Sequence, residues 1–317
     1  MRSVGMDGVM TCPSDLSVLL EEILTQVRSL DLGGDVARYI PELAKVAPDK
    51  LGIAIYLADG TILTAGDAYE RFSIQSISKL ATLIMAYQLQ GDDLWTRVGR
   101  EPSGSPFNSL VQLEADNGIP RNPFINAGAL VITDMLCSHY AHPDLAILEF
   151  LRHASGVPDL NFSQQVAQSE AMHGFRNAAM ANFIKSFGNL HAPAPTVLQT
   201  YFRQCAIEMS CRELVQAARI LVHYGCVPGD GRVVLTAEEV RRIASVMLTC
   251  GTYDAAGDVA FRIGLPAKSG VGGGILAVIP GRLAICVWSP PLDSIGNSVA
   301  GLKLLELISR RVGWSIF

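Results

Sequence analysis

Strand patterns stand at both ends of this 317-residue chain, and a long stretch with few of them lies between. Near the beginning, residues 51–57 (LGIAIYL) are followed by Asp59-Gly60 and TILTAG, which is typical of a strand, a tight turn and a second strand. Near the end, GGILAVIPGRLAICVWSPP places the Pro280-Gly281 turn between two apolar runs. Each end of the chain therefore contributes a predicted β-hairpin.

The segments beside the second hairpin predict one further strand and a closing helix. Residues 259–266 (VAFRIGLP) indicate the strand. The stretch NSVAGLKLLELISRRVGW has apolar residues at helical spacing, and either Asn297 or Ser298 can cap that helix. Helical patterns fill the middle of the chain: SLVQLEADNG, NAGALVITDMLCSHY, PDLAILEFLRHASG, FSQQVAQSEAMHGFRNAAMANFIKSFG, SCRELVQAARILVHYG and TAEEVRRIASVMLTCG.

This order of elements predicts an α/β (α+β) fold, in which one antiparallel sheet is built from both ends of the chain and a helical region is inserted between them. We expect residues 1–317 to form a single domain, because no repeat or flexible linker divides them. Its sheet lobe is expected near residues 30–75 and 255–317, and its helical lobe near residues 76–254. The seam between two lobes is a usual place for a pocket.

Composition argues against several classes of protein. Hydrophobic residues make up 49% of the chain and charged residues 17%, which is typical of a compact globular protein. The net charge of −5 provides no basic surface for nucleic acid. The first residues, MRSVGMDGVMTCP, lack the apolar core of a secretory signal, and no run of 18 apolar residues could span a membrane, so we expect a cytoplasmic protein. The seven cysteines and six histidines form no metal-binding motif, and we expect neither a metal nor a cofactor.

A serine and a lysine stand one helical turn apart where an apolar helix is predicted to begin. Ser76 and Lys79 lie in FSIQSISKLATLIMAYQLQ, and residues three apart share a helix face. A partly desolvated lysine can accept the serine proton, and the helix amino terminus favours negative charge forming at the serine. The four-residue motif by itself also fits an N-capping serine followed by a solvated lysine. Its context must therefore decide between the two.

That context resembles the serine-dependent glutaminase family, whose members share the β-lactamase and transpeptidase-like fold. The resemblance rests on seven blocks in a fixed order that cover nearly the whole chain. The blocks are YIPELAKV (39–46), FSIQSISK (72–79), EPSGSPFNS (101–109), RNPFINAGA (121–129), YFRQCAIE (201–208), GTYDAAGDVA (251–260) and AKSGVGGGI (267–275). The resemblance implies hydrolysis of L-glutamine to L-glutamate and ammonia through an acyl-serine, without a cofactor, by a homodimer or homotetramer.

The resemblance also implies roles for individual residues. Ser76 would be the nucleophile and Lys79 its proton acceptor, and Tyr253 would assist the departing ammonia. The backbone N–H groups of Ser76 and Val271 would form the oxyanion hole. The residues implied to line the glutamine pocket are Asn126, Glu170, Asn177, Tyr201 and Tyr253, with Tyr39 near the substrate. A free amino acid carries an ammonium and a carboxylate, so a carboxylate beside amide and hydroxyl donors is a suitable set of partners.

Two alternatives stay open at this point. A β-lactamase or penicillin-binding enzyme uses the same Ser-x-x-Lys element together with a Lys-Thr-Gly triplet, which Lys268-Ser269-Gly270 resembles. The chain nevertheless contains no SDN, SxN or YxN triplet. The second alternative is a ligand-binding protein of the same fold that has lost catalysis, which the intact Ser76, Lys79 and Tyr253 argue against.

Overall fold

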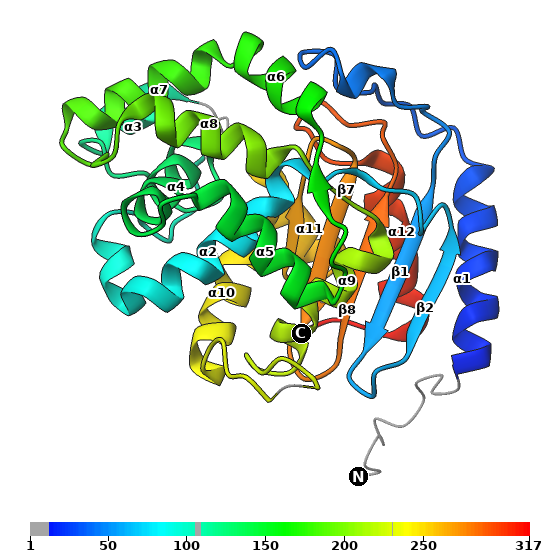
Figure 1. Ribbon diagram of the computed structural model, residues 1–317. Helices are drawn as coiled ribbons and strands as arrows, with labels where there is room; N and C mark the ends of the chain where they lie inside the picture. Colours follow the sequence, from blue (N-terminus) through cyan, green and yellow to red (C-terminus); the bar gives the residue numbers. More distant parts are fainter. Residues whose placement is uncertain (1–12, 105–108, 230) are drawn as a thin grey trace.

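The computed structural model describes residues 13–104, 109–229 and 231–317. The predictions made from the first twelve residues, and the middle of the EPSGSPFNS block, lie outside these ranges. A five-stranded sheet forms the centre of the molecule, in the order β2-β1-β8-β7-β6, with every neighbouring pair antiparallel (Figure 1). Its strands are β1 (Gly52–Leu57), β2 (Ile62–Gly66), β6 (Ala267–Ser269), β7 (Gly274–Ile279) and β8 (Leu283–Trp288). Both predicted hairpins are thus confirmed, and β1 pairs with β8, so that one sheet joins the two ends of the chain.

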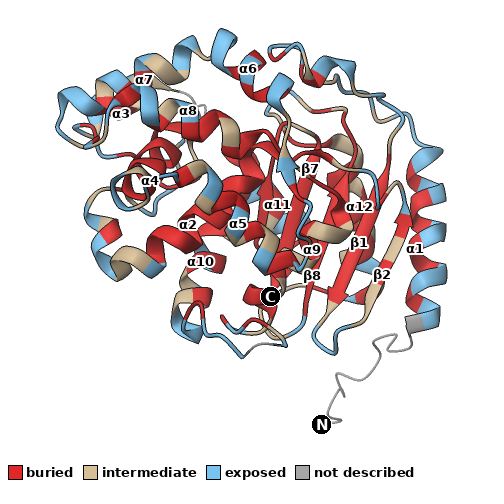
Figure 2. Ribbon diagram, in the orientation of Figure 1, coloured by how far each residue is buried: buried red, intermediate tan, exposed pale blue. Residues whose placement is uncertain are grey.

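Alternate residues of the central strands enter two separate hydrophobic cores, because successive side chains of a strand point to opposite faces. Ile53 and Ile285 pack with α1 (Pro13–Arg28) and α12 (Val299–Val312) on one face. Cys286 enters the larger core on the other face, which is covered by α9 (Cys211–Val222) and, beyond it, α5 (Pro143–Ser155). Strands β7 and β8 are buried along their whole length, and β1 is buried except at Leu57 (Figure 2). Burial on both faces explains their nearly continuous apolar sequences.

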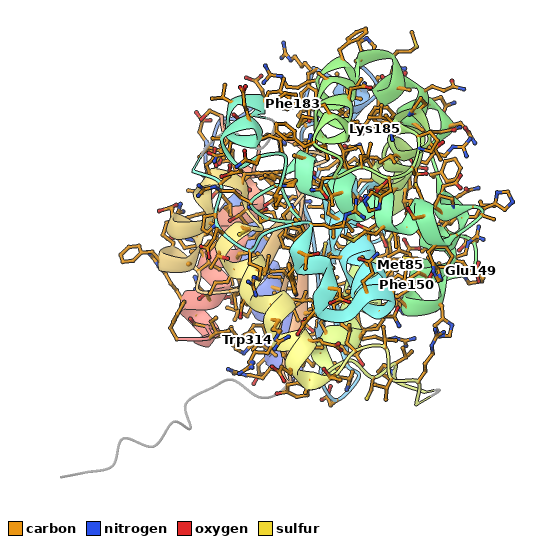
Figure 3. The ribbon with its side chains drawn as sticks, turned by 90° about the vertical axis from the view of Figure 1, so that its left-hand side faces the viewer. Met85, Glu149, Phe150, Phe183, Lys185 and Trp314 are labelled. Atoms are coloured by element: carbon orange, nitrogen blue, oxygen red, sulfur yellow. The ribbon has the colours of Figure 1, made fainter. Side chains whose placement is uncertain are left out.

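Helices from the middle of the chain pack beside the sheet (Figure 1). Within this region α2 (Ser78–Gln90) contacts α5, where Met85 and Phe150 lie close together (Figure 3). Trp314 lies far from Phe183 and Lys185 of α7 (Phe175–Ser186) in the same view. The other α-helices of the region are α3 (Leu110–Ala115), α4 (Asn126–His139), α6 (Gln164–His173), α8 (Ala194–Cys205) and α10 (Ala237–Cys250). No helix in the described ranges combines the length and apolar character needed to cross a membrane.

One predicted strand is wrong. Residues 259–266 do not form a strand, because most of α11 (Ala256–Arg262) occupies the beginning of that range, and the next strand starts only at β6. Val259 and Ile263 are buried four residues apart, which is helical spacing, and Asp258 pairs with Arg262 across one turn. The predicted cap of α12 is confirmed for Ser298, whose side chain accepts from the N–H at position 301.

The sequence patterns also missed a second sheet, which has three short strands in the order β3-β5-β4. These strands are β3 (Phe72–Ser73), β4 (Asn161–Phe162) and β5 (Ile207–Met209). Strand β3 directly precedes the Ser76 segment, and β5 directly follows α8. Strands of two or three residues are too short to show an alternating pattern. This small sheet ties the Ser76 segment to the helix that carries Tyr201. The proposed division into two lobes stays a prediction.

Candidate active site

A cavity of about 250 Å³ lies where the Ser76 segment, the amino terminus of α4 and helices α6 to α8 meet. Seven of the nine residues expected at the site line it: Tyr39, Ser76, Asn126, Glu170, Asn177, Tyr201 and Val271. The other two, Lys79 and Tyr253, lie directly behind this lining and are buried. The chain thus gathers all nine residues around one cavity, although the sequence separates them by more than 200 positions.

Ser76 lies on a tight turn that joins β3 to α2. The turn is a 3₁₀-helix, Gln75–Ile77, and α2 begins only at Ser78, so Ser76 precedes the α-helix that the sequence placed it in. Only 9% of the surface of Ser76 is exposed, and that part faces the cavity. Its hydroxyl hydrogen-bonds the phenolic group of Tyr253. The position before the first turns of a helix also exposes Ser76 to the positive end of the helix dipole.

Lys79 is almost completely buried, with 1% of its surface exposed. Its Nζ donates to the carbonyl oxygen of Phe124 at 3.1 Å and to Oδ1 of Asn126 at 2.7 Å. Burial lowers the pKa of Lys79 from 10.5 to about 8, because water no longer stabilises the charged form. A neutral amine has two N–H bonds and one lone pair. The two hydrogen bonds use both N–H bonds, so the lone pair is left to accept a proton.

Asn126 organises one wall of the cavity from the first position of α4. Its Oδ1 accepts from Lys79 and, at 3.3 Å, from the hydroxyl of Tyr201. Its Nδ2 donates to Oδ1 of Asn177 at 3.0 Å. These donors and acceptors determine how both amides are oriented. The Nδ2 of Asn177 is therefore directed away from Asn126 and is available to a ligand in the cavity.

Glu170 is a buried carboxyl group on α6, and 6% of its surface is exposed. Its Oε1 has no hydrogen-bond partner in the described ranges of the chain. Burial raises the pKa of Glu170 to about 7, while hydrogen bonding from Gln75 and the charge of Lys79 act in the opposite direction. A buried carboxylate with an unsatisfied oxygen is costly for the protein alone, and a ligand ammonium in the cavity would satisfy it.

Ser76 and Val271 both line the cavity, and the backbone N–H of each is a candidate donor there. Within the described part of the chain, neither the N–H of Ser76 nor that of Val271 donates to another protein group. Val271 follows β6 in the glycine-rich turn of residues 270–274, which passes close to the Ser76 segment. Two free donors near a nucleophile form a suitable site for a developing oxyanion.

Tyr253 and Tyr39 approach the site from different segments. Tyr253 is buried and donates its hydroxyl to the carbonyl oxygen of Ser269 at 3.3 Å. Tyr39 is 58% exposed at the edge of the cavity.

Sequence reasoning gave no role to three further buried groups around the site. Gln75 lines the cavity immediately before Ser76. Lys268 donates to two carbonyl oxygens, those of Gly251 and Ser269, and its Nζ lies 4.9 Å from the centre of the Tyr253 ring. Burial lowers the pKa of Lys268 well below 10.5. Cys205 lies near Lys79, and burial raises the pKa of its thiol far above neutral. All three stand in blocks that carry the family resemblance, and Lys268 also stands in the Lys-Ser-Gly triplet.

The described residues include no group of three His, Cys, Asp or Glu side chains that could hold a metal ion. The arrangement instead combines a buried amine, a hydroxyl, two free N–H groups and a buried carboxylate. This combination suits acyl transfer from a small amide that carries an ammonium group.

Comparison with known proteins agrees with this class of enzyme. The Glutaminase family model matches residues 34–317, so the chain belongs to the glutaminase family. The glutaminase of Paraburkholderia phytofirmans is 54% identical over 94% of this chain and 98% of its own length. The solved structure of the probable glutaminase ybaS has a TM-score of 0.92 at 37% identity, over 97% of this chain and 99% of that one.

A third relative was solved with a bound compound. It is a probable glutaminase from Bacillus subtilis complexed with 6-diazo-5-oxo-L-norleucine, with a TM-score of 0.86 at 32% identity over 99% of this chain and 100% of that one. The fold is therefore the β-lactamase-like fold of bacterial glutaminases.

Proposed function

We propose that this glutaminase hydrolyses L-glutamine through an acyl-enzyme formed on Ser76, with Lys79 as the proton acceptor. The observation that carries the proposal is the state of Lys79. This buried amine has a pKa near 8, its two N–H bonds are occupied, and it stands one helical turn after a serine that opens onto the cavity. Such an amine can be neutral at the working pH and act as a base.

In acylation, the lone pair of Lys79 takes the hydroxyl proton of Ser76 as Oγ attacks the side-chain amide carbon of glutamine. The N–H groups of Ser76 and Val271 stabilise the oxyanion of the tetrahedral intermediate. When the carbon–nitrogen bond breaks, the proton returns to the leaving nitrogen through the Tyr253 hydroxyl, and ammonia departs. Water then attacks the ester with Lys79 again as base, which releases glutamate and restores the Ser76 hydroxyl.

The cavity supports glutamine as the substrate. Glu170 supplies a negative charge for the α-ammonium, and Nδ2 of Asn177 supplies a donor for the α-carboxylate, which the Tyr201 hydroxyl can join by turning its O–H away from Asn126. The volume of about 250 Å³ is suited to a single amino acid. The Bacillus subtilis relative was solved with 6-diazo-5-oxo-L-norleucine, an electrophile with the backbone of an amino acid, which supports the same choice of substrate.

The test measures ammonia release from glutamine, asparagine and a β-lactam by the wild type, Ser76→Ala, Lys79→Ala and the double variant. We expect each single change to lower kcat by several orders of magnitude and the double change to add little, since the two groups act as one unit. Ser155→Ala is the matched control, because this buried serine bonds only to the backbone of Leu151, Arg152 and Val157 and lies outside the cavity. Multiplicative losses from two modest single effects would contradict the Ser-Lys pair.

The pH dependence gives a second test of Lys79. The amine must lose its proton before it can act as a base, so kcat should rise about tenfold per pH unit below pH 8 and level off above it. Lys79→Arg keeps a positive charge at all accessible pH values, and we expect it to be inactive throughout. Mass spectrometry of the wild type with 6-diazo-5-oxo-L-norleucine should locate the adduct on Ser76. An unlabelled protein would indicate the ligand-binding alternative.

A further inference from the structure

Two residues of the candidate active site have a positive φ, a backbone conformation that residues other than glycine and asparagine rarely adopt. Gln75 has a φ of 48° and Tyr253 a φ of 57°. Among the described residues, the other non-glycine residues with positive φ are Asn117 and Tyr224. Such a conformation costs on the order of 1 kcal/mol or more and persists only where the surrounding structure imposes it. Gln75 directly precedes Ser76, so its conformation determines how Ser76 is presented.

Contacts from both sides hold the backbone before Ser76 in place. On one side, Ile74 N–H donates to the carbonyl oxygen of Ile207 at 2.9 Å, and Ser73 Oγ donates to the carbonyl oxygen of Cys205 at 2.9 Å. On the other side, the glycine-rich turn is in direct contact with the same segment. A Cβ added at Gly272 would stand 2.2 Å from the Ser73 carbonyl oxygen. The backbone at Gly272 therefore packs directly against the backbone at Ser73, with no space for a side chain between them.

The carbonyl oxygen of Gln75 is also occupied. It accepts from the backbone N–H of Ser78 and, at 2.7 Å, from the Ser78 hydroxyl. Ser78 is fully buried. On the other side of Gln75, the carbonyl oxygen of Ile74 accepts from the Ile77 N–H at 3.0 Å, so hydrogen bonds hold both peptide groups that flank this left-handed residue.

The side chain of Gln75 connects this turn to the opposite wall of the cavity. Its Nε2 donates to Ser73 Oγ at 2.9 Å, and Gln75 and Glu170 line the same cavity, where hydrogen bonding from Gln75 opposes the effect of burial on the Glu170 pKa. A carboxylate only accepts hydrogen bonds, so the amide N–H₂ is the group that can serve both Ser73 and Glu170. Gln75 is 3% exposed, and its amide is therefore confined to this bridge.

We propose that Gln75 is a positioning residue, whose strained backbone presents the Ser76 hydroxyl and N–H to the cavity and whose side-chain amide keeps the Glu170 carboxylate in place for the substrate ammonium. The proposal rests on the functions proposed above for Ser76 and Glu170. It adds that one residue aligns the nucleophile with the group that orients the substrate.

The pKa of Glu170 can be followed as a test of this role. It would stay unchanged if Gln75 only stabilised the fold. Removing the Gln75 donor should raise the pKa of Glu170, since this hydrogen bond opposes the effect of burial. The titratable and charged groups that face Glu170 or share its cavity are Lys79 of α2, Tyr201 and Cys205 of α8, Tyr39 of the segment before β1, His173 at the end of α6 and Arg176 of α7. Each of these is unchanged in the variants below.

The experiment compares three variants of the full chain, Gln75→Met, Gln75→Glu and Gln75→Gly, by ammonia release between pH 5.5 and 9. Methionine keeps the length but loses the donor. We expect KM for glutamine at pH 7 to rise about tenfold or more. As the pH is lowered, KM should also begin to rise at a higher pH than in the wild type. Gln75→Glu places a second carboxyl group beside Glu170, and two neighbouring carboxylates do not ionise independently. The pH at which KM begins to rise should therefore be highest in this variant.

Glycine separates the backbone from the side chain. Because glycine adopts positive φ without strain, Gln75→Gly removes the side chain while the turn can still form, and KM should rise as in the methionine variant. Gln204→Met is the matched control, since Gln204 is a buried glutamine that does not line the cavity, and its KM profile should not move.

The results separate this proposal from the proposed function. If 6-diazo-5-oxo-L-norleucine labels Ser76 in the wild type but the KM profiles of all three variants coincide with that of the wild type, Gln75 has no positioning role and the proposed function still stands. Absence of labelling in the wild type would overturn the proposed function itself. Should Gln75→Glu not fold, the KM profiles of Gln75→Gly and Gln75→Met still decide the question, because both substitutions remove the same donor and should raise KM to the same extent above the wild type.

Discussion

Replacing Glu170 with glutamine should weaken glutamine binding and stabilise the free protein at the same time. The carboxyl group is buried, and its pKa is raised from 4.5 to about 7. Glutamine at this position keeps the shape but removes the charge. We therefore expect a higher KM for L-glutamine, by a factor corresponding to about 2 kcal/mol if the ammonium pair is desolvated.

The size of the stability change follows from the difference in pKa. A raised carboxyl pKa means that the folded state holds the proton more tightly than the unfolded state, so the free energy of unfolding falls as pH rises from 4.5 to 7. A difference of about 2.5 units corresponds to about 3 kcal/mol. Glu170→Gln should thus gain roughly 3 kcal/mol over the wild type at pH 8 and little at pH 4.5.

The same group sets the pH dependence of KM in the wild type. Only the ionised carboxylate attracts an ammonium, and with a pKa near 7 about one molecule in eleven is ionised at pH 6. KM should therefore rise about tenfold per pH unit below pH 7, and this rise should vanish in Glu170→Gln. The charge of Glu170 raises the pKa of Lys79, so the rise of kcat should also shift to lower pH in the variant.

Two assays check these expectations. Ammonia release gives KM and kcat, and urea unfolding without ligand gives the free energy of unfolding at pH 5 and pH 8. Glu208→Gln is the control, since burial also raises the pKa of this half-buried carboxyl group, which lies outside the cavity. N-acetylglutamine lacks the ammonium, and it should be a poor substrate that gains relative to glutamine in Glu170→Gln. The reasoning is refuted if the wild type turns over both substrates equally and Glu170→Gln leaves KM unchanged.

Two further predictions concern the support of the site. Asp134→Ala should lower the free energy of unfolding by about 3 to 5 kcal/mol in urea titrations. Asp134 is fully buried, and its removal leaves the guanidinium of Arg97, 2.6 Å away, without its carboxylate. A loss below about 1 kcal/mol would contradict this account. Gly128→Ala should lower kcat, because its Cβ would stand 1.9 Å from the carbonyl oxygen of Asn122 and displace the first turn of α4. Gly257→Ala is the control: its Cβ has open space around it, so kcat should stay unchanged.

The elements that the sequence predicted correctly are those that a few neighbouring residues specify. The two hairpins were recognisable because their turns contain Asp59-Gly60 and Pro280-Gly281 between apolar runs, and these residue types form tight turns wherever they occur. The cap at Ser298 follows the same logic, since a serine side chain satisfies a helix N–H three residues away. The seven ordered blocks identified the family, and with it the residues that line the cavity.

The segment 259–266 shows where local pattern is insufficient. Val259, Ile263 and Leu265 are all buried, and a run of closely spaced apolar residues fits a buried strand as well as a short helix. The packing of α11 against α10 decided between the two. The three-stranded sheet was missed for a related reason, because its pairing joins strands from distant parts of the chain.

The amino-acid sequence by itself determined which residues are present to attack, donate and bind, and the order of the elements that carry them. Only the tertiary structure decided their chemical state. Lys79 has a pKa near 8 and Glu170 a pKa near 7 because both are buried by distant segments, and Gln75 is left-handed because distant backbone groups confine its neighbours. Desolvation and backbone strain depend on what surrounds a residue in space, and the linear sequence does not contain that information explicitly.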